Sequence, residues 1–295
     1  MNSKILVTGG NGYIGSQIIK LYFKKGIKTD SLGRGENKNK IVSKYFQVDI
    51  TDYNNLRRFK NNYDLIIHCA GSPNVSRSVK LPIFDFNINL LGTLNMLEFA
   101  RKNNSKFILL STVSVFSTEN ELPLTENSKK KVSSPYGASK LSAESYCNAY
   151  FRSYGLDIRI ARIFNTYGPG MKHLFISDMI KKIKTAKELV TIGGTGNQVR
   201  DYVFIDDLVQ AISLIISDGE PGEDYNICSG RKVTLYQLTN LLIDKLNKKN
   251  IKINCDQISY PGDIEKWYGN PKKIKKLGFI QKVKLETGIE RTINN

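Results

Sequence analysis

The stretch Thr8-Gly9-Gly10-Asn11-Gly12-Tyr13-Ile14-Gly15 joins an apolar run at Lys4–Thr8 to an amphipathic pattern over Tyr13–Lys25. Its regularly spaced glycines allow the backbone to turn tightly and to approach a pyrophosphate closely. The positive end of the helix that follows favours negative charge at the same place. Strand, glycine turn and helix in this order predict a dinucleotide-binding unit.

The residues after this turn continue the alternation of short apolar runs and longer helical patterns, which is typical of repeated βαβ units. Further strands are predicted at Lys28–Leu32, Lys44–Val48, Leu65–Cys69, Phe107–Ser111 and Asp157–Ile163. Further helices are predicted near Tyr53–Lys60, Ile83–Asn103 and Pro135–Tyr154. The sequence therefore predicts an α/β fold with a Rossmann-type, doubly wound parallel sheet.

A change of rhythm at Gly168-Pro169-Gly170 marks the expected division of the chain. Shorter helices and strands follow, separated by glycine-rich turns such as Gly193–Gly196. We expect residues 1–168 to form the NAD(P)-binding Rossmann domain and residues 169–295 to form mainly a smaller α/β substrate-binding lobe. Within the latter, 199–228 is expected to return to the main sheet through a strand and helix near Val199–Ile216.

Composition argues against several classes of protein. The start of the chain lacks the features of a signal peptide, and no apolar run approaches the roughly 18 residues of a membrane span. The formal charge is +17, but the lysines are dispersed, so nucleic-acid binding is not favoured. No metal site is predicted, because the two histidines, His68 and His173, have no partner at metal-ligand spacing. The four cysteines are also scattered, which indicates a reducing cytoplasm: they are Cys69, Cys147, Cys228 and Cys255.

The pair Tyr136 and Lys140 opens the predicted helix Pro135–Tyr154, and Thr112 stands at the tip of a predicted strand. Residues four apart share one face of a helix, so the Lys140 ammonium is expected to lower the pKa of Tyr136. Tyr136 would then act as a general acid or base on a hydroxyl or carbonyl, with Thr112 hydrogen-bonded to the same oxygen.

The choice of cofactor depends on the end of the second strand. An acid there binds the free ribose of NAD, whereas a 2′-phosphate needs positive charge. This strand ends in Gly33-Arg34, which favours NADP, although Asp30 is close enough to keep NAD open.

Together these motifs resemble the extended short-chain dehydrogenase family, which includes UDP-glucose 4-epimerases, sugar-nucleotide 4,6-dehydratases and 4-ketoreductases. Other matching stretches are Asn89–Thr93, Arg162–Gly170, Val199–Val203 and Pro261–Asp263. The resemblance implies a homodimer formed through the helices Ile83–Asn103 and Pro135–Tyr154. It also implies the cofactor contacts Gly9, Gly12, Tyr13, Ile14, Gly15, Arg34, Asp49, Ile50, Ala70, Gly71, Asn89, Tyr136 and Lys140.

The same resemblance implies a nucleotide-activated hexose as substrate. Asn165 and Arg200 would hold its diphosphate, and Asp263 the nucleotide ribose. An ion pair of Arg200 with Asp201 or Asp206 is the alternative. Tyr260 departs from the family, since many relatives carry an arginine there. Trp267 resembles the residue that limits the C2 substituent of the sugar in the 4-epimerases, where a bulky indole would exclude an N-acetyl group. Packing of Trp267 in the hydrophobic core is the alternative.

The reaction is narrowed by the strand tip. In the dehydratases that this chain resembles, the strand tip carries Thr-Asp-Glu. This chain has Thr112-Val113-Ser114 instead, so a dehydratase is not expected. The Gly33-Arg34 and Val115-Phe116 pairs favour a 4-keto(-6-deoxy)hexose nucleotide reductase. A nucleotide-sugar 4-epimerase is the alternative, and a non-catalytic Rossmann protein that binds nucleotide or RNA is the alternative of another class.

Overall fold

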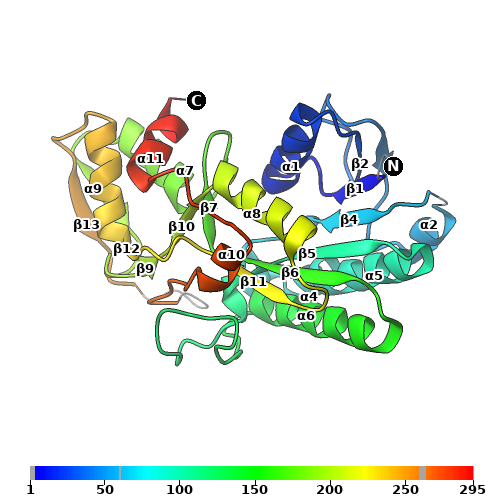
Figure 1. Ribbon diagram of the computed structural model, residues 1–295. Coiled ribbons are helices and arrows are strands. Elements are labelled where there is room, and N and C mark those ends of the chain that lie inside the picture. Colours follow the sequence, from blue (N-terminus) through cyan, green and yellow to red (C-terminus); the bar gives the residue numbers. More distant parts are fainter. Residues whose placement is uncertain (1–3, 60, 259–263, 295) are drawn as a thin grey trace.

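The structure is a computed structural model that describes residues 4–59, 61–258 and 264–294. Seven parallel strands form its central sheet, with helices on both faces and a smaller lobe at one side (Figure 1). The strand order is β3-β2-β1-β4-β5-β6-β11. Because the order reverses between β1 and β4, the carboxyl ends of these strands flank the crevice where such sheets bind dinucleotides. The predicted doubly wound sheet is confirmed.

Each of the predicted strands is present, within two residues of its expected ends. The central strands are mostly apolar and buried, because helices cover both faces of a parallel sheet. The strands of the sheet are β1 (Ile5–Thr8), β2 (Thr29–Gly33), β3 (Tyr45–Gln47), β4 (Leu65–His68), β5 (Lys106–Thr112), β6 (Ile158–Ile163) and β11 (Asp224–Ile227).

The two faces of the sheet carry separate hydrophobic clusters. On one face, α1 (Tyr13–Lys24) and α8 (Ile205–Asp218) pack against the strands and each other. On the other face lie α2 (Tyr53–Arg58), α5 (Gly92–Asn103) and α6 (Pro135–Tyr154). Figure 1 shows α1 and α8 above the sheet and α5 and α6 below it.

The single helix predicted at Ile83–Asn103 is interrupted. It consists of α4 (Pro82–Phe86), a π-helical turn η1 (Asn87–Leu91) and α5. A π turn adds a residue to one helical turn and shifts the register of the side chains that follow. A further helix, α3 (Val75–Lys80), was not predicted.

Helix α8 packs on the main sheet and strand β11 joins it, but the predicted strand near residue 199 does not. Its two parts are β9 (Val199–Arg200), which pairs with β12 (Val233–Thr234), and β10 (Tyr202–Phe204), which pairs with β7 (Asn165–Tyr167). The strand that joins β6 is β11 instead.

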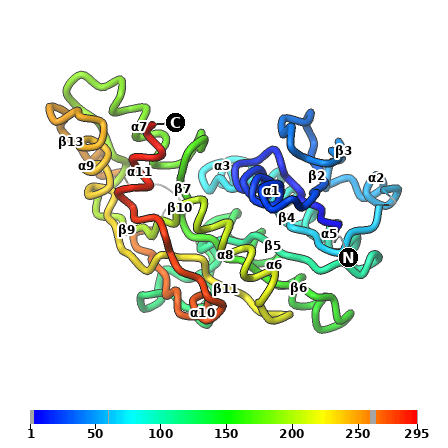
Figure 2. Tube along the Cα trace, turned by 45° about the horizontal axis from the view of Figure 1, so that its top comes forward, coloured from blue at the N-terminus to red at the C-terminus, as the bar shows by residue number. Residues whose placement is uncertain are grey.

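The lobe combines short strands and helices, and Figure 2 shows it beside the sheet on the side away from the chain's first strand. None of the described helices is long and apolar enough to cross a membrane. Besides the 3₁₀ turn η2 (Val113–Val115), the remaining elements are α7 (Phe175–Thr185), β8 (Leu189–Ile192), α9 (Leu235–Lys245), β13 (Lys252–Cys255), α10 (Lys272–Lys276) and α11 (Leu285–Ile293).

Candidate active site

The glycine turn lies at the carboxyl end of β1 and depends on its lack of side chains. Gly9 adopts a left-handed conformation with φ of +68° and donates its amide to the Leu32 carbonyl at 2.8 Å. A Cβ on Gly15 would lie 2.5 Å from the Gly9 carbonyl oxygen. Helix α1 then begins at Tyr13, after the N-cap Gly12, with no side-chain cap and no acid in its first turn. Its first amides can therefore receive an anion such as a pyrophosphate.

Tyr13 and Ile14, the first residues of α1, are both partly buried. The Tyr13 hydroxyl has no hydrogen-bond partner among the described residues, and it lies 2.8 Å from where a Cβ on Gly168 would stand. Tyr13 thus packs the cofactor turn against the loop that follows β7.

The tip of β2 presents Arg34, whose side chain is exposed. Its guanidinium lies 6.0 Å from the centre of the Phe84 ring, and the Arg77 guanidinium lies 4.1 Å from the same ring. Asp30 stands three residues before the end of β2, and its carboxylate accepts a hydrogen bond from Tyr63 at 2.9 Å. Asp30 is therefore already engaged within the fold.

Further residues that were expected to contact the cofactor lie just after β3 and β4. The Asp49 carboxylate accepts from the amide and hydroxyl of Thr51, both at 2.9 Å, while Ile50 is buried. The amide of Ala70 donates to a buried hydroxyl of β1, and a Cβ on Gly71 would lie 2.9 Å from Asn89 Oδ1. The fold thus brings these residues to the carboxyl edge of the sheet, beside the glycine turn.

Helix α6 begins where Ser134 Oγ accepts from the Gly137 amide at 3.2 Å, with a proline at its first position. A Cβ on Gly137 would lie 2.5 Å from the Ser114 carbonyl oxygen, so this glycine lets α6 approach the tip of β5 closely. The approach buries Tyr136 beside Thr112.

Burial raises the pKa of Tyr136 to about 12, although the hydrogen bond with Thr112 opposes this shift. The expected lowering of this pKa by Lys140 is therefore wrong for the protein as described, because desolvation disfavours the phenolate more strongly. The Lys140 Nζ donates to the Leu110 carbonyl at 2.6 Å. Burial lowers the pKa of Lys140 to about 8.

A buried polar cluster beside these residues was not predicted. Asp85 on α4 accepts from Ser139 Oγ at 2.6 Å and from Asn89 Nδ2 at 2.9 Å. Its charge raises the pKa of both Tyr136 and Lys140. The spacing of four between Asp85 and Asn89 was the available signal, but only the packing of α4 on α6 places the carboxylate here.

The expected substrate residues lie where the lobe meets the sheet. Asn165 on β7 donates its side-chain amide to the Asp201 carbonyl at 3.1 Å. The buried Arg200 guanidinium donates to the carbonyls of Val199 and Glu265 and lies 4.8 Å from the Trp267 ring centre.

Of the two aspartates weighed as partners of Arg200, Asp201 accepts instead from the amides of Ser229, Gly230 and Gly269. The other, Asp206, pairs with Arg291. Tyr260 and Asp263 lie outside the described residues.

Trp267 packs partly buried against a small apolar cluster that includes Phe116 and Phe164. Trp267 therefore contacts both this cluster and Arg200. Both alternatives, a residue that limits the C2 substituent and a residue of the core, stay open. Across the part of the chain that the structure describes, no group of three or more His, Cys, Asp or Glu could hold a metal ion.

Comparison with known proteins agrees with this architecture. The model of the NAD dependent epimerase/dehydratase family matches residues 5–228. A putative UDP-glucose 4-epimerase of Methanocaldococcus jannaschii is 32% identical over 306 residues, covering 98% of this chain and 97% of that protein.

Two solved structures show the same fold over almost the whole chain. UDP-glucose 4-epimerase of Thermotoga maritima with UDP-glucose is 30% identical with a TM-score of 0.91, covering 99% of this chain and 97% of its own. DesIV, a dTDP-glucose 4,6-dehydratase of Streptomyces venezuelae with NAD bound, is 28% identical with a TM-score of 0.90, covering 99% and 96%. A match of this extent establishes that the chain belongs to the NAD-dependent epimerase/dehydratase family, within the extended short-chain dehydrogenases.

Proposed function

We propose that this protein is an NADP-dependent reductase of 4-keto(-6-deoxy)hexose nucleotides. The observation that carries the proposal is the Tyr136 hydroxyl buried beside Thr112 at the tip of β5, where burial favours its protonated form and raises its pKa to about 12. A ketone reductase needs a proton donor at this place, whereas the oxidation that opens an epimerase cycle needs a base.

The residues of the chain then have distinct roles. A reduced nicotinamide, when bound, supplies the hydride. Tyr136 donates the proton to the carbonyl oxygen, and Thr112 holds that oxygen by a hydrogen bond. Lys140 lies one helical turn after Tyr136 on the buried face of α6, so its ammonium can stabilise the tyrosinate that remains. The buried position of all three excludes water from the reacting oxygen.

The cofactor choice rests on the tip of β2. Arg34 offers a planar guanidinium to a 2′-phosphate. The Arg77 guanidinium lies near the same Phe84 ring and adds positive charge. The acid that could have bound a free ribose, Asp30, is engaged with Tyr63. NAD, which the family description names, is the alternative.

The substrate is proposed to lie between the sheet and the lobe of residues 169–295. Asn165 and Arg200 would hold its diphosphate, Asp263 its ribose, and Trp267 would limit the group at C2 of the hexose. The contact between Arg200 and Trp267 supports this placement of the substrate. The Arg200 guanidinium lies 4.8 Å from the centre of the Trp267 ring, so both residues can reach the same ligand.

The second candidate is a nucleotide-sugar 4-epimerase, which the names of two relatives favour. Stoichiometry separates the two reactions, because a reductase consumes one reduced cofactor per product and an epimerase regenerates its own. Enzyme stripped of nucleotide should bleach NADPH in proportion to a 4-keto-6-deoxy nucleotide sugar supplied by a dehydratase. Interconversion of UDP-glucose and UDP-galactose without net bleaching would instead establish the epimerase.

A nucleotide- or RNA-binding protein without catalysis remains the candidate of another class, since the formal charge is +17. It predicts retention of RNA in a gel-shift assay with a steep dependence on salt. The proposed reductase predicts weak retention that does not compete with NADPH.

We also propose a homodimer formed by the helices around α4 and α6. Large apolar side chains are exposed there, with Ile83 73%, Phe86 48% and Tyr146 42% accessible in the single chain. Contiguous exposed apolar surface marks interaction sites. Ile83→Asp should lower the mass measured by analytical ultracentrifugation, while Ile280→Asp, at an equally exposed position of the lobe, should not.

A further inference from the structure

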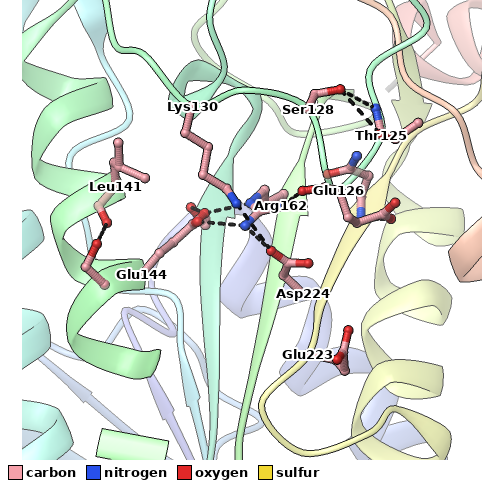
Figure 3. Close-up of polar contacts among 12 residues, drawn as sticks. Thr125, Glu126, Ser128, Lys130, Leu141, Glu144, Arg162, Glu223 and Asp224 are labelled. Atoms are coloured by element: carbon pink, nitrogen blue, oxygen red, sulfur yellow. Dashed lines mark hydrogen bonds and ion pairs between the residues drawn. The ribbon is translucent and has the colours of Figure 1, made fainter. Parts of the chain in front are cut away.

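A buried ion-pair network lies beneath the candidate catalytic residues and was assigned no role above. Its centre is Arg162 on β6, which is 1% exposed. Glu144 on α6, 2% exposed, accepts from Arg162 Nε at 2.9 Å and from its Nη2 at 2.8 Å. Asp224 on β11 pairs with the same guanidinium. Figure 3 shows the two carboxylates reaching Arg162 from different sides.

The two carboxylates differ in what else they bind. Glu144 also accepts from Ser111 Oγ at 2.6 Å, and Ser111 directly precedes Thr112 on β5. Asp224 is 21% exposed, and its other partners are the ammonium groups of Lys130 at 3.9 Å and Lys273 at 3.6 Å. One carboxylate therefore faces the site and the other faces the surface.

The position of Glu144 along α6 connects it with the reacting groups. It follows Lys140 by four residues and Tyr136 by eight, so all three lie on the same buried face of the helix. Lys140 itself reaches β5 through the Leu110 carbonyl. Glu144 and Lys140 thus attach the catalytic helix to consecutive residues at the end of β5.

The Arg162 guanidinium extends this attachment beyond β5. It lies 5.3 Å from the ring centre of Phe116, which follows the strand tip, and 3.5 Å separate its Nη1 from the Glu126 carbonyl oxygen. Glu126 in turn accepts from the Asn226 amide of β11 at 2.9 Å. The residues after Thr112 are therefore held against the same arginine.

We propose that Glu144 is a positioning residue: by binding Ser111 and Arg162 together, it sets the distance between Thr112 on β5 and Tyr136 and Lys140 on α6. The inference rests on the proposed function, since it needs Tyr136 to transfer a proton. Asp224 neutralises the outer side of Arg162 and does not set this distance.

The charge of Glu144 also acts on Lys140, whose pKa it raises against the effect of burial. Loss of that charge should therefore shift the deprotonation of Lys140 to lower pH. The titratable groups that face Lys140 come from three elements, namely Glu144, Cys147 and Tyr136 of α6, Asp85 of α4, and His68 and Cys69 at the end of β4.

The experiment compares Glu144→Gln with Asp224→Asn. Each substitution neutralises one carboxylate that pairs with the Arg162 guanidinium and keeps the side-chain volume nearly constant. Turnover is measured on whichever sugar nucleotide supports activity that Tyr136→Phe abolishes, together with NADPH affinity by fluorescence and stability by urea unfolding. Glu144→Gln should lower kcat at least tenfold, change KM and the NADPH Kd less than about twofold, and move the alkaline limb of kcat to lower pH. Asp224→Asn should lower stability alone.

Ser111→Ala tests the inference without disturbing the ion pair, in case Glu144→Gln does not fold. It should lower kcat about threefold, with no change in the pH profile, and add nothing when combined with Glu144→Gln. Equal kcat values and pH profiles for Glu144→Gln and Asp224→Asn, or unchanged kcat for Ser111→Ala, would overturn the proposal. Absence of any turnover in the wild-type protein would contradict the proposed function instead.

Discussion

The cofactor half and the sugar half of the candidate site are built in different ways. At the glycine turn, the proposed binding groups are backbone amides at the start of α1, whose geometry depends on the glycines of residues 9–15. In the sugar half, side chains converge from separate segments, with Asn165 on β7, Arg200 on β9 and Trp267 beyond β13. A substitution in one half should therefore affect one ligand, and only the residues between the halves should affect the chemistry.

The largest effect is expected at Tyr136, which lies between the two halves. Tyr136→Phe removes the proton donor, which should lower kcat at least about a hundredfold, the lower end for general acid–base catalysis. The side chain is buried, and its ring is retained, so the urea midpoint and the NADPH affinity should stay close to the wild-type values. Near-normal turnover on the true substrate would refute the mechanism.

The same contrast explains how far the sequence was sufficient. The sheet and the glycine turn were predicted because local patterns of two, three or four residues determine them. Tyr136, Lys140 and Thr112 were brought together as expected. The pKa of Tyr136 was predicted in the wrong direction, because spacing reveals a neighbouring charge but not the depth of burial.

Other features were missed because they depend on tertiary contacts. Glu144 could have been noticed from its spacing of four from Lys140, yet its partner Arg162 comes from β6 and is recognisable only when β6 and α6 are packed. The π turn at Asn87–Leu91 has no simple periodic signature, and the strand near residue 199 pairs outside the sheet.

The second effect concerns the cofactor half. Arg34→Ala should weaken NADPH binding by about 1.5–3 kcal/mol, the range for a hydrogen bond to a charged group. The NADPH Kd should therefore rise roughly ten- to a hundredfold. NADH affinity and KM for the sugar nucleotide should change little. Titration of both cofactors against wild-type and variant protein provides the measurement, and Arg77→Ala separates the two guanidiniums near Phe84. Equal losses for NADPH and NADH would make Arg34 a general surface charge.

The third prediction places acid sensitivity in the cofactor half. His68 bonds Thr8 Oγ1 at 2.8 Å and Thr93 Oγ1 at 3.1 Å, and burial lowers its pKa to about 3. The unfolded chain binds this proton below about pH 6.5 and the folded protein does not, so stability falls as the pH drops from there towards 3. At pH 5 this group should cost about 2 kcal/mol of unfolding free energy relative to pH 8.

Urea unfolding of His68→Gln at both pH values measures that term, because the variant should lose this part of the pH dependence whatever its absolute stability. His173→Gln, which replaces the exposed histidine, is the matched control. A pH dependence that is the same in His68→Gln and in the wild type would mean that the buried ring does not remain neutral.

The smallest effect is expected in the sugar half, at the contact between Arg200 and Trp267. A partly desolvated cation–π contact contributes about 1 kcal/mol, so Trp267→Ala should raise KM for the sugar nucleotide about fivefold. NADPH affinity should not change, because the described contacts of this pair are with Val199, Glu265 and the apolar cluster of Phe116 and Phe164. Trp267→Phe keeps an aromatic face towards Arg200 and loses the second ring with its indole N–H, a buried donor without a partner among the described residues, so its KM should rise less than that of Trp267→Ala. If Trp267 also limits the C2 group of the hexose, the alanine variant should gain activity on an N-acetylated substrate while the phenylalanine variant gains less.

A change in NADPH affinity as large as the change in KM would show that the two halves of the site are coupled. The two halves would then not act independently, although they are built from different segments.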